Sequence, residues 1–163
     1  MGCTVIMMIV NTNNEILHYI QSLSDDVLSM HIAFGLDWEI KKKTFWQRFL
    51  TLYSNADYYT KAPGKYWDPT GTIPNYVKDY NNVRNIIIEK NNQGGINSTF
   101  RHHYIYNLGV LSSRETNNKN ILDSAINASI RLRAEALLVT LLDLGYTSPE
   151  DIYDKVNRVI GKK

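Results

Sequence analysis

The chain has 163 residues, of which 44% are apolar, a length and composition typical of one globular domain with its own core. Its 18 basic and 16 acidic residues leave a formal net charge of +2, which does not favour a nucleic acid or an anionic membrane as partner. The single cysteine, Cys3, excludes an intrachain disulfide and a cysteine-cluster zinc site, so we expect a cytoplasmic protein.

The first twelve residues are expected to be extended or loosely packed within a single domain that spans residues 1–163. The apolar run Val5 to Val10 is too short to cross a bilayer, which takes about 20 residues, and it lacks the basic start of a secretory signal. Gly2 and Cys3 are possible acylation sites, but Ile6 stands where the myristoylation pattern has serine or threonine. The pattern therefore favours a buried strand or helical turn over a lipid anchor.

Six or seven helices are expected in the rest of the chain. Serine, aspartate and asparagine side chains accept hydrogen bonds from the first turn of a helix, and glycine commonly follows its last turn. Such residues recur between apolar stretches, although the β-branched run "NIII" is equally compatible with a short strand. The expected caps are Ser24, Asp37, Asn75, Ser98 and Ser148, with Pro149 in the first turn of the last helix and Gly145 and Gly161 as helix ends.

The segment from Asn120 to Leu144 is predicted to form one long helix. Its apolar residues fall on two adjacent faces, and from Ala134 onward it is apolar almost all round. A helix of this kind lies in the middle of a bundle, because other helices must cover all its sides. The sequence therefore predicts an all-α fold, a single helical bundle with the helix 120–144 at its centre.

An aromatic region in the first half of the chain is where we expect a partner or ligand to bind. It comprises a predicted helix, 37–53, and the following segment 54–74, whose three prolines and two glycines predict a long irregular loop. Aromatic residues are enriched at binding hot spots, although those of the helix could equally pack in the core. The candidate binding residues are Trp38, Trp46, Tyr58, Tyr59, Tyr66 and Trp67.

Two adjacent histidines, His102 and His103, are the most conspicuous candidates for metal binding or catalysis. On a helix they point about 100° apart, and no usual transition-metal ligand lies four residues from either, so they cannot hold one ion together. His31 is expected to be a hydrogen-bonded core residue. We therefore predict no metal, no cofactor and no catalytic residue.

Charged residues on the predicted long helix also need partners. Arg133 falls between its two apolar faces and Asp143 falls within one of them, and a structural salt bridge is favoured over an anion contact. Arg131 and Glu135 are spaced to form an ion pair across one turn.

The leading hypothesis is a small, intracellular, non-enzymatic binding or assembly protein. It would self-associate through apolar helix surfaces, or bind a protein partner through its aromatic face. A first alternative is a metal-dependent hydrolase of phosphodiesters, which would use His102 or His103 with remote acids such as Asp57, Asp68 or Asp79. The second alternative, a nucleic-acid-binding protein, would use Lys41, Lys42, Lys43, Arg48, Arg101, His102 and Arg133.

Overall fold

The structure, a computed structural model, describes residues 14–50, 56–95, 98–117 and 120–161, most of which are helical. This confirms the predicted all-α class. The described residues form eight helices, one or two more than expected, and a sheet of two short strands. The helices are α2 (Asn14–Ser22), α3 (Asp25–Gly35), α4 (Phe45–Leu50), α5 (Tyr80–Gln93), α6 (Phe100–Thr116), α7 (Ile121–Ile126), α8 (Ile130–Asp143) and α9 (Pro149–Ile160), and the strands are β1 (Glu39–Lys42) and β2 (Tyr58–Lys61).

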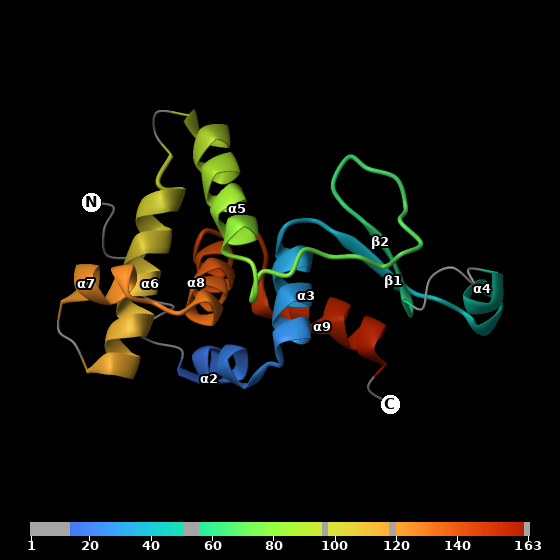
Figure 1. The fold of residues 1–163 in the computed structure, drawn as a ribbon, viewed down its shortest axis with the longest axis horizontal. Helices are drawn as coiled ribbons and strands as arrows, with labels where there is room; N and C mark the ends of the chain where they lie inside the picture. The colour runs from blue at the N-terminus through green and yellow to red at the C-terminus, as the bar shows by residue number, and fades with distance from the viewer. Residues whose placement is uncertain (1–13, 51–55, 96–97, 118–119, 162–163) are drawn as a thin grey trace.

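Helix α8 lies at the centre of the bundle, with α6 on one side of it and α3 on the other (Figure 1). Ten of its fourteen residues are buried, including the uninterrupted run from Ala134 to Leu142. Its apolar composition explains this position, because a helix that is apolar on all sides is stable only where neighbours cover all sides. The predicted central helix is confirmed for this part of the segment 120–144.

The continuity of the predicted helix 120–144 is wrong, because the chain leaves the helical path at residues 127–129, between α7 and α8. The Ser129 side chain caps α8 by accepting a hydrogen bond from the backbone N–H of Leu132 at 3.2 Å. The Arg133 guanidinium donates to backbone carbonyls at the end of α7, among them that of Ile126 at 3.0 Å. Local polar side chains thus satisfy the ends of two shorter helices and override the continuous apolar pattern.

The predicted helix 37–53 is confirmed only at residues 45–50, which form α4, and it is wrong for residues 37–44. Asp37 has a positive φ of 62° just after α3, and β1 follows in place of a helical turn. β1 pairs antiparallel with β2, so that Glu39 lies opposite Lys61 and Lys42 lies opposite Tyr58. The prediction that the segment 54–74 is one irregular loop is also wrong, because β2 lies within it. Pairing between distant segments therefore decides the structure here, as is usual for short strands.

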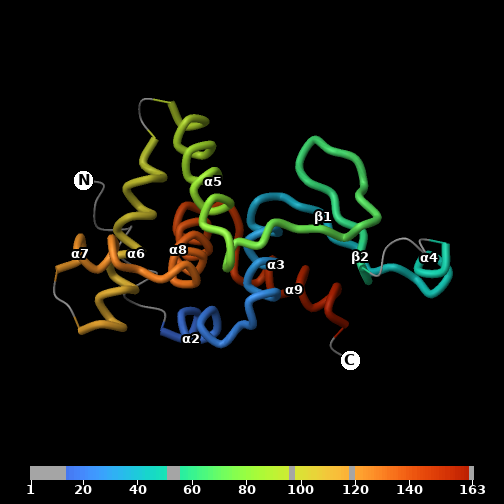
Figure 2. Tube along the Cα trace, viewed as in Figure 1, coloured from blue at the N-terminus to red at the C-terminus, as the bar shows by residue number. Residues whose placement is uncertain are grey.

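We call residues 39–61 the arm. Its two strands lead away from the bundle, and α4 lies at its far end, at one extremity of the molecule (Figures 1 and 2). The base of the arm is fixed to its surroundings: Ile40 and Thr60 are buried, and the Thr60 hydroxyl donates to the backbone carbonyl of Thr72 at 3.0 Å. Lys43 is also buried, and its ammonium group donates to the carbonyl of Pro69 at 2.5 Å. The arm is therefore a folded element that presents α4 in a defined position.

The expected caps are confirmed best at the last helix. The Ser148 hydroxyl accepts from the backbone N–H of Asp151 at 3.1 Å, Pro149 lies in the first turn of α9, and Gly161 follows its end at a φ of 67°. Helix α3 begins directly after Ser24, although this side chain makes no capping hydrogen bond. Other starts differ: Asp79 caps α5 in place of Asn75, Thr99 precedes α6 in place of Ser98, and the run "NIII" is helical within α5.

Two further expectations concern the N-terminal segment and membranes. The segment 1–12, with its possible acylation sites, lies outside the described residues. Among the helices that are described, none combines the length and the apolar character needed to span a membrane.

Candidate functional site

Helix α4 exposes an apolar surface. The side chains of Phe45, Trp46, Phe49 and Leu50 are 76%, 71%, 60% and 75% exposed, and no residue of this helix is buried. The rings of Phe45 and Trp46 meet edge to face, with their centroids 5.7 Å apart. Because four large apolar side chains on one short helix stay in solvent, folding of the chain alone does not account for them.

A capping box explains how so short a helix persists without packing against the bundle. The backbone N–H of Thr44 donates to the Gln47 side chain at 2.9 Å, and the N–H of Gln47 donates to the Thr44 hydroxyl at 3.3 Å. This reciprocal pair satisfies two N–H groups at the start of α4. An ion pair between Arg48 of α4 and Asp57 at 3.3 Å adds a link across the arm.

The arm is basic. It contains five lysine and arginine side chains and two acidic ones, Glu39 and Asp57, so it carries a net charge of +3. Both acidic side chains form ion pairs within the arm, Glu39 with Lys61 and Asp57 with Arg48. Of the remaining lysines, Lys41 and Lys42 on β1 are exposed and Lys43 is buried, so a partner of α4 would also meet two lysines of the adjacent strand.

The six predicted binding residues lie on the arm or beside it, but they differ in exposure. Trp46 on α4 and Tyr66, in the loop after β2, are exposed. The other four are half-buried: Trp38 and Tyr58 pack against the core, whereas Tyr59 and Trp67 lie beneath lysine side chains. Phe45, Phe49 and Leu50 belong to the predicted aromatic helix but not to the six candidate residues, and they share the exposed surface with Trp46. The pattern Thr44-x-x-Gln47 could have revealed them, since it marks the start of a separate short helix.

A cavity of about 530 Å³ lies between α2, α3, α8 and α9, and we call it the α2/α9 groove. Apolar side chains such as Leu138 and Leu142 of α8 line it, together with the rings of Tyr19 and Tyr153. Three exposed carboxylates also line it, and no lysine or arginine of the described residues does. These carboxylates are Glu15, Glu150 and Asp154. The groove therefore combines an apolar interior with negative charge.

Hydrogen bonds fix one wall of this groove. His31 Nδ1 donates to the backbone carbonyl of Val27 at 2.7 Å, so Nε2 of the neutral ring accepts from the Tyr19 hydroxyl at 2.9 Å. Burial lowers the pKa of His31, while its hydrogen bond to the carbonyl acts in the opposite direction. The Tyr19 ring meets that of Tyr153 edge to face, with 5.9 Å between centroids. The prediction of a hydrogen-bonded core histidine is confirmed, and this histidine supports an aromatic wall.

A second cavity, of about 420 Å³, lies between α5 and α6. Arg84 and Arg101 line it together with side-chain amides and the rings of Tyr80 and Tyr104, and no carboxylate of the described residues lines it. The guanidinium group of Arg133 lies 4.9 Å from the centre of the Tyr80 ring. Burial raises the pKa of Tyr104, and the nearby positive charge of Arg133 acts against that rise. This composition suits an anionic ligand with an apolar part.

The residues of the nucleic-acid alternative do not form one surface. Lys41, Lys42, Lys43 and Arg48 lie on the arm, whereas Arg101, His102 and Arg133 belong to α6 and α8 on the other side of α3 (Figure 1). Lys43 is buried, so it is not available at the surface.

The residues of the hydrolase alternative are likewise dispersed. His102 is exposed and His103 is half-buried, and both burial and the neighbouring His102 lower the pKa of His103. The proposed acids have local roles: Asp57 pairs with Arg48, Asp68 accepts from Thr70 in a turn, and Asp79 caps α5. Within the described ranges, no three histidine, cysteine, aspartate or glutamate side chains are grouped so that they could hold a metal ion.

The charged residues of the segment 120–144 bond to nearby side chains and backbone carbonyls. Arg131 bonds to Glu135 at 2.9 Å, as predicted, and also to Asp25 of α3 at 2.5 Å. Arg133 bonds to backbone carbonyls in place of a carboxylate, and Asp143 accepts a hydrogen bond from the Asn107 amide at 2.7 Å. The predicted Arg131–Glu135 pair is therefore confirmed, whereas the salt bridge expected for Arg133 and Asp143 is wrong, because neither forms an ion pair with a described residue.

A comparison with models of known protein families, with curated proteins and with solved structures gave no significant match.

Proposed function

We propose that this protein is a non-enzymatic binding or assembly protein of the cytoplasm, which contacts another protein surface through α4. The observation that carries the proposal is the set of four large apolar side chains on α4, each at least 60% exposed. Clustered apolar side chains in solvent mark interaction sites, and aromatic residues supply much of the binding energy at such sites.

The way in which the arm holds α4 supports this function. Because the capping box and the buried base of the arm fix the helix before binding, little conformational entropy is lost when a partner arrives. An apolar helix held in solvent promotes aggregation unless a binding partner covers it.

The proposal is tested by replacing two α4 side chains and measuring the size of the complexes that form. The test variant is Trp46→Ser with Phe49→Ser. The matched control is Leu122→Ser on α7, a helix of equal length at the opposite end of the molecule, where Leu122 is 64% exposed (Figure 1). Light scattering of the purified protein and gel filtration of an extract of its source cells give the sizes.

We expect the native chain and the control to form complexes larger than one chain, and the α4 variant to lose them. Equal sizes for all three proteins, in both measurements, would contradict the proposed role of α4. Circular dichroism verifies that the variants keep their helices.

A second candidate function is nucleic-acid binding, and the cavity between α5 and α6 favours it. Two arginines and two tyrosine rings at one cavity match the chemistry of phosphate contact and base stacking. Arg101 belongs to both this cavity and the set predicted from sequence. The metal-dependent hydrolase remains a prediction without a supporting cluster in the described part of the chain.

A further inference from the structure

We infer that the partner of α4 is a second copy of this chain, and that α4 of one copy docks in the α2/α9 groove of the other. The inference rests on the proposed function, because it requires α4 to be the recognition element. It adds the identity of the partner and the surface on which α4 binds.

The charges of the two surfaces are complementary. The arm carries a net charge of +3, with Lys41 and Lys42 exposed on β1 beside α4. The groove is lined by three exposed carboxylates, Glu15, Glu150 and Asp154, and by no lysine or arginine among the described residues. Opposite charges around an apolar contact steer association and fix its orientation.

The apolar parts are complementary as well. The groove, of about 530 Å³, has the size of cavities that bind compact apolar groups, and aliphatic side chains and tyrosine rings line it. Tyr19 and Tyr153 already meet edge to face at the wall of this groove, the geometry that aromatic rings prefer. Trp46 or Phe49 of an incoming α4 can extend this aromatic cluster. The interface would thus have an apolar centre and a charged rim, as stable interfaces do.

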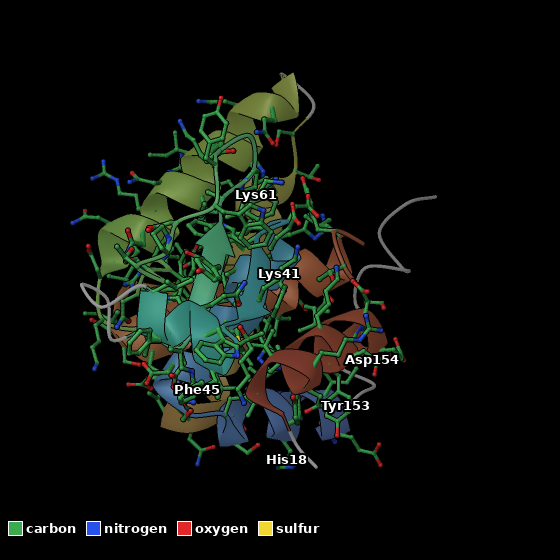
Figure 3. The ribbon with its side chains drawn as sticks, turned by 90° about the vertical axis from the view of Figure 1, so that its right-hand side faces the viewer. His18, Lys41, Phe45, Lys61, Tyr153 and Asp154 are labelled. Carbon is green, nitrogen blue, oxygen red and sulfur yellow. The ribbon has the colours of Figure 1, made fainter. Side chains whose placement is uncertain are left out.

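The arm of a chain does not fill its own groove. Figure 3 shows Phe45 on the arm at a separate place from Tyr153 and Asp154 of α9, and α4 has no buried residue. The docking surface and its receptor are therefore different parts of one chain and pair between copies. If two copies each dock their α4 in the groove of the other, they form a closed dimer. If each copy docks in the groove of a different copy, an open head-to-tail assembly forms.

A charge-exchange experiment tests the inference with full-length chains. The arm variant is Lys41→Glu with Lys42→Glu, and the groove variant is Glu150→Lys with Asp154→Lys. Each variant alone has an arm and a groove of the same sign, so we expect each to sediment as a monomer at concentrations where the native chain associates. An equimolar mixture pairs an acidic arm with a basic groove, so association should return in the mixture alone.

Two further variants complete the experiment, one as a control and one as a substitute for the groove variant. Lys65→Glu with Lys78→Glu changes the net charge as much as the arm variant does, at exposed lysines outside both surfaces, and should associate like the native chain. Glu15→Lys with Asp154→Lys also makes the groove basic, and this pair replaces the first groove variant if lysine at position 150 weakens the start of α9. Circular dichroism again verifies folding.

The outcomes separate this inference from the proposed function. A native chain that stays monomeric up to millimolar concentration, charge variants that associate like the native chain, or a mixture that stays monomeric would each overturn docking between copies. The proposed function would survive those results with a different partner. It fails when the Trp46→Ser and Phe49→Ser variant forms the same complexes as the native chain.

Discussion

The Tyr19 hydroxyl donates a hydrogen bond to Nε2 of His31 across 2.9 Å and so links helix α2 to helix α3. The bond is possible because the backbone carbonyl of Val27 fixes the proton of the ring on Nδ1. His31 is only 2% exposed, so its ring is largely withdrawn from water. One side-chain pair therefore orients the aromatic wall of the α2/α9 groove and attaches α2 to the bundle.

Replacing Tyr19 with phenylalanine should destabilise the fold, although the ring and its packing are retained. The change leaves Nε2 of His31 buried without a donor, which costs about 1–3 kcal/mol in the free energy of unfolding. Urea unfolding followed by circular dichroism measures the difference. Tyr153→Phe is the matched control, because its ring meets that of Tyr19 without a hydrogen bond to His31, and it should leave the unfolding midpoint within error.

His31 should also make stability depend on pH. Burial lowers its pKa below the ordinary value of 6.5, so the unfolded chain binds a proton at a pH where the folded chain does not. The contribution of the neutral ring is complete above pH 6.5 and is lost as the pH falls from there through the lowered pKa of the folded state. Unfolding free energies of the native chain and of His31→Gln, measured between pH 5 and about pH 8, isolate this contribution. Their difference should shrink toward low pH, and a constant difference would exclude the titration of His31 as its cause.

The stability of the variant Arg131→Met should also depend on pH, because Arg131 pairs with the buried Glu135. Glu135 is 4% exposed, and burial raises its pKa while Arg131 acts to lower it. Removing the guanidinium leaves a buried carboxylate without its partner and should cost about 3 kcal/mol at neutral pH. The pKa of Glu135 rises further in the variant, so its stability relative to the native chain should recover as the pH falls toward about 5, where protonation removes the charge.

Thermal or urea unfolding at both pH values checks this prediction. Lys155→Met is the control, since its ion pair with Asp151 at 2.7 Å is exposed and should contribute well under about 1 kcal/mol. An equal loss in the two variants would mean that Glu135 does not depend on Arg131.

The central helix and the last helix could be predicted because their signals are local. The run from Ala134 to Leu142 requires burial on all sides, and Ser148 with Pro149 marks the start of a helix in whatever context it occurs. Periodicity alone could not reveal the break before α8. There, hydrogen bonds of Ser129 and Arg133 to nearby backbone groups outweigh the few turns that a continuous helix would gain.

The arm could not be predicted in the same way, because its strands depend on each other. The segment 39–42 becomes a strand only when it meets the segment 58–61, and residues 43–57 separate the two along the chain. In a continuous helix 37–53, Phe45 and Phe49 could have packed in the core. Because the strands pair, both residues lie on α4 and are exposed. The six candidate residues thus lie on the arm or beside it, while the exposure of the α4 side chains follows from a non-local contact.

The cavity between α5 and α6 leads to the last prediction, for a single-stranded oligonucleotide as ligand. If Arg84 and Arg101 each contact one phosphate, log K should fall with log salt at a slope of about −1.4, since each contact to a single strand contributes about −0.7. Arg101→Gln should bring the slope to about −0.7 and weaken binding for all base sequences alike. Fluorescence anisotropy between about 50 and 200 mM salt measures both quantities.

Lys65→Gln, an exposed lysine that does not line this cavity, is the control and should keep the native slope. If Arg101→Gln binds with the native slope and affinity, the cavity does not hold the strand, and nucleic-acid binding loses the one cluster of residues that favours it.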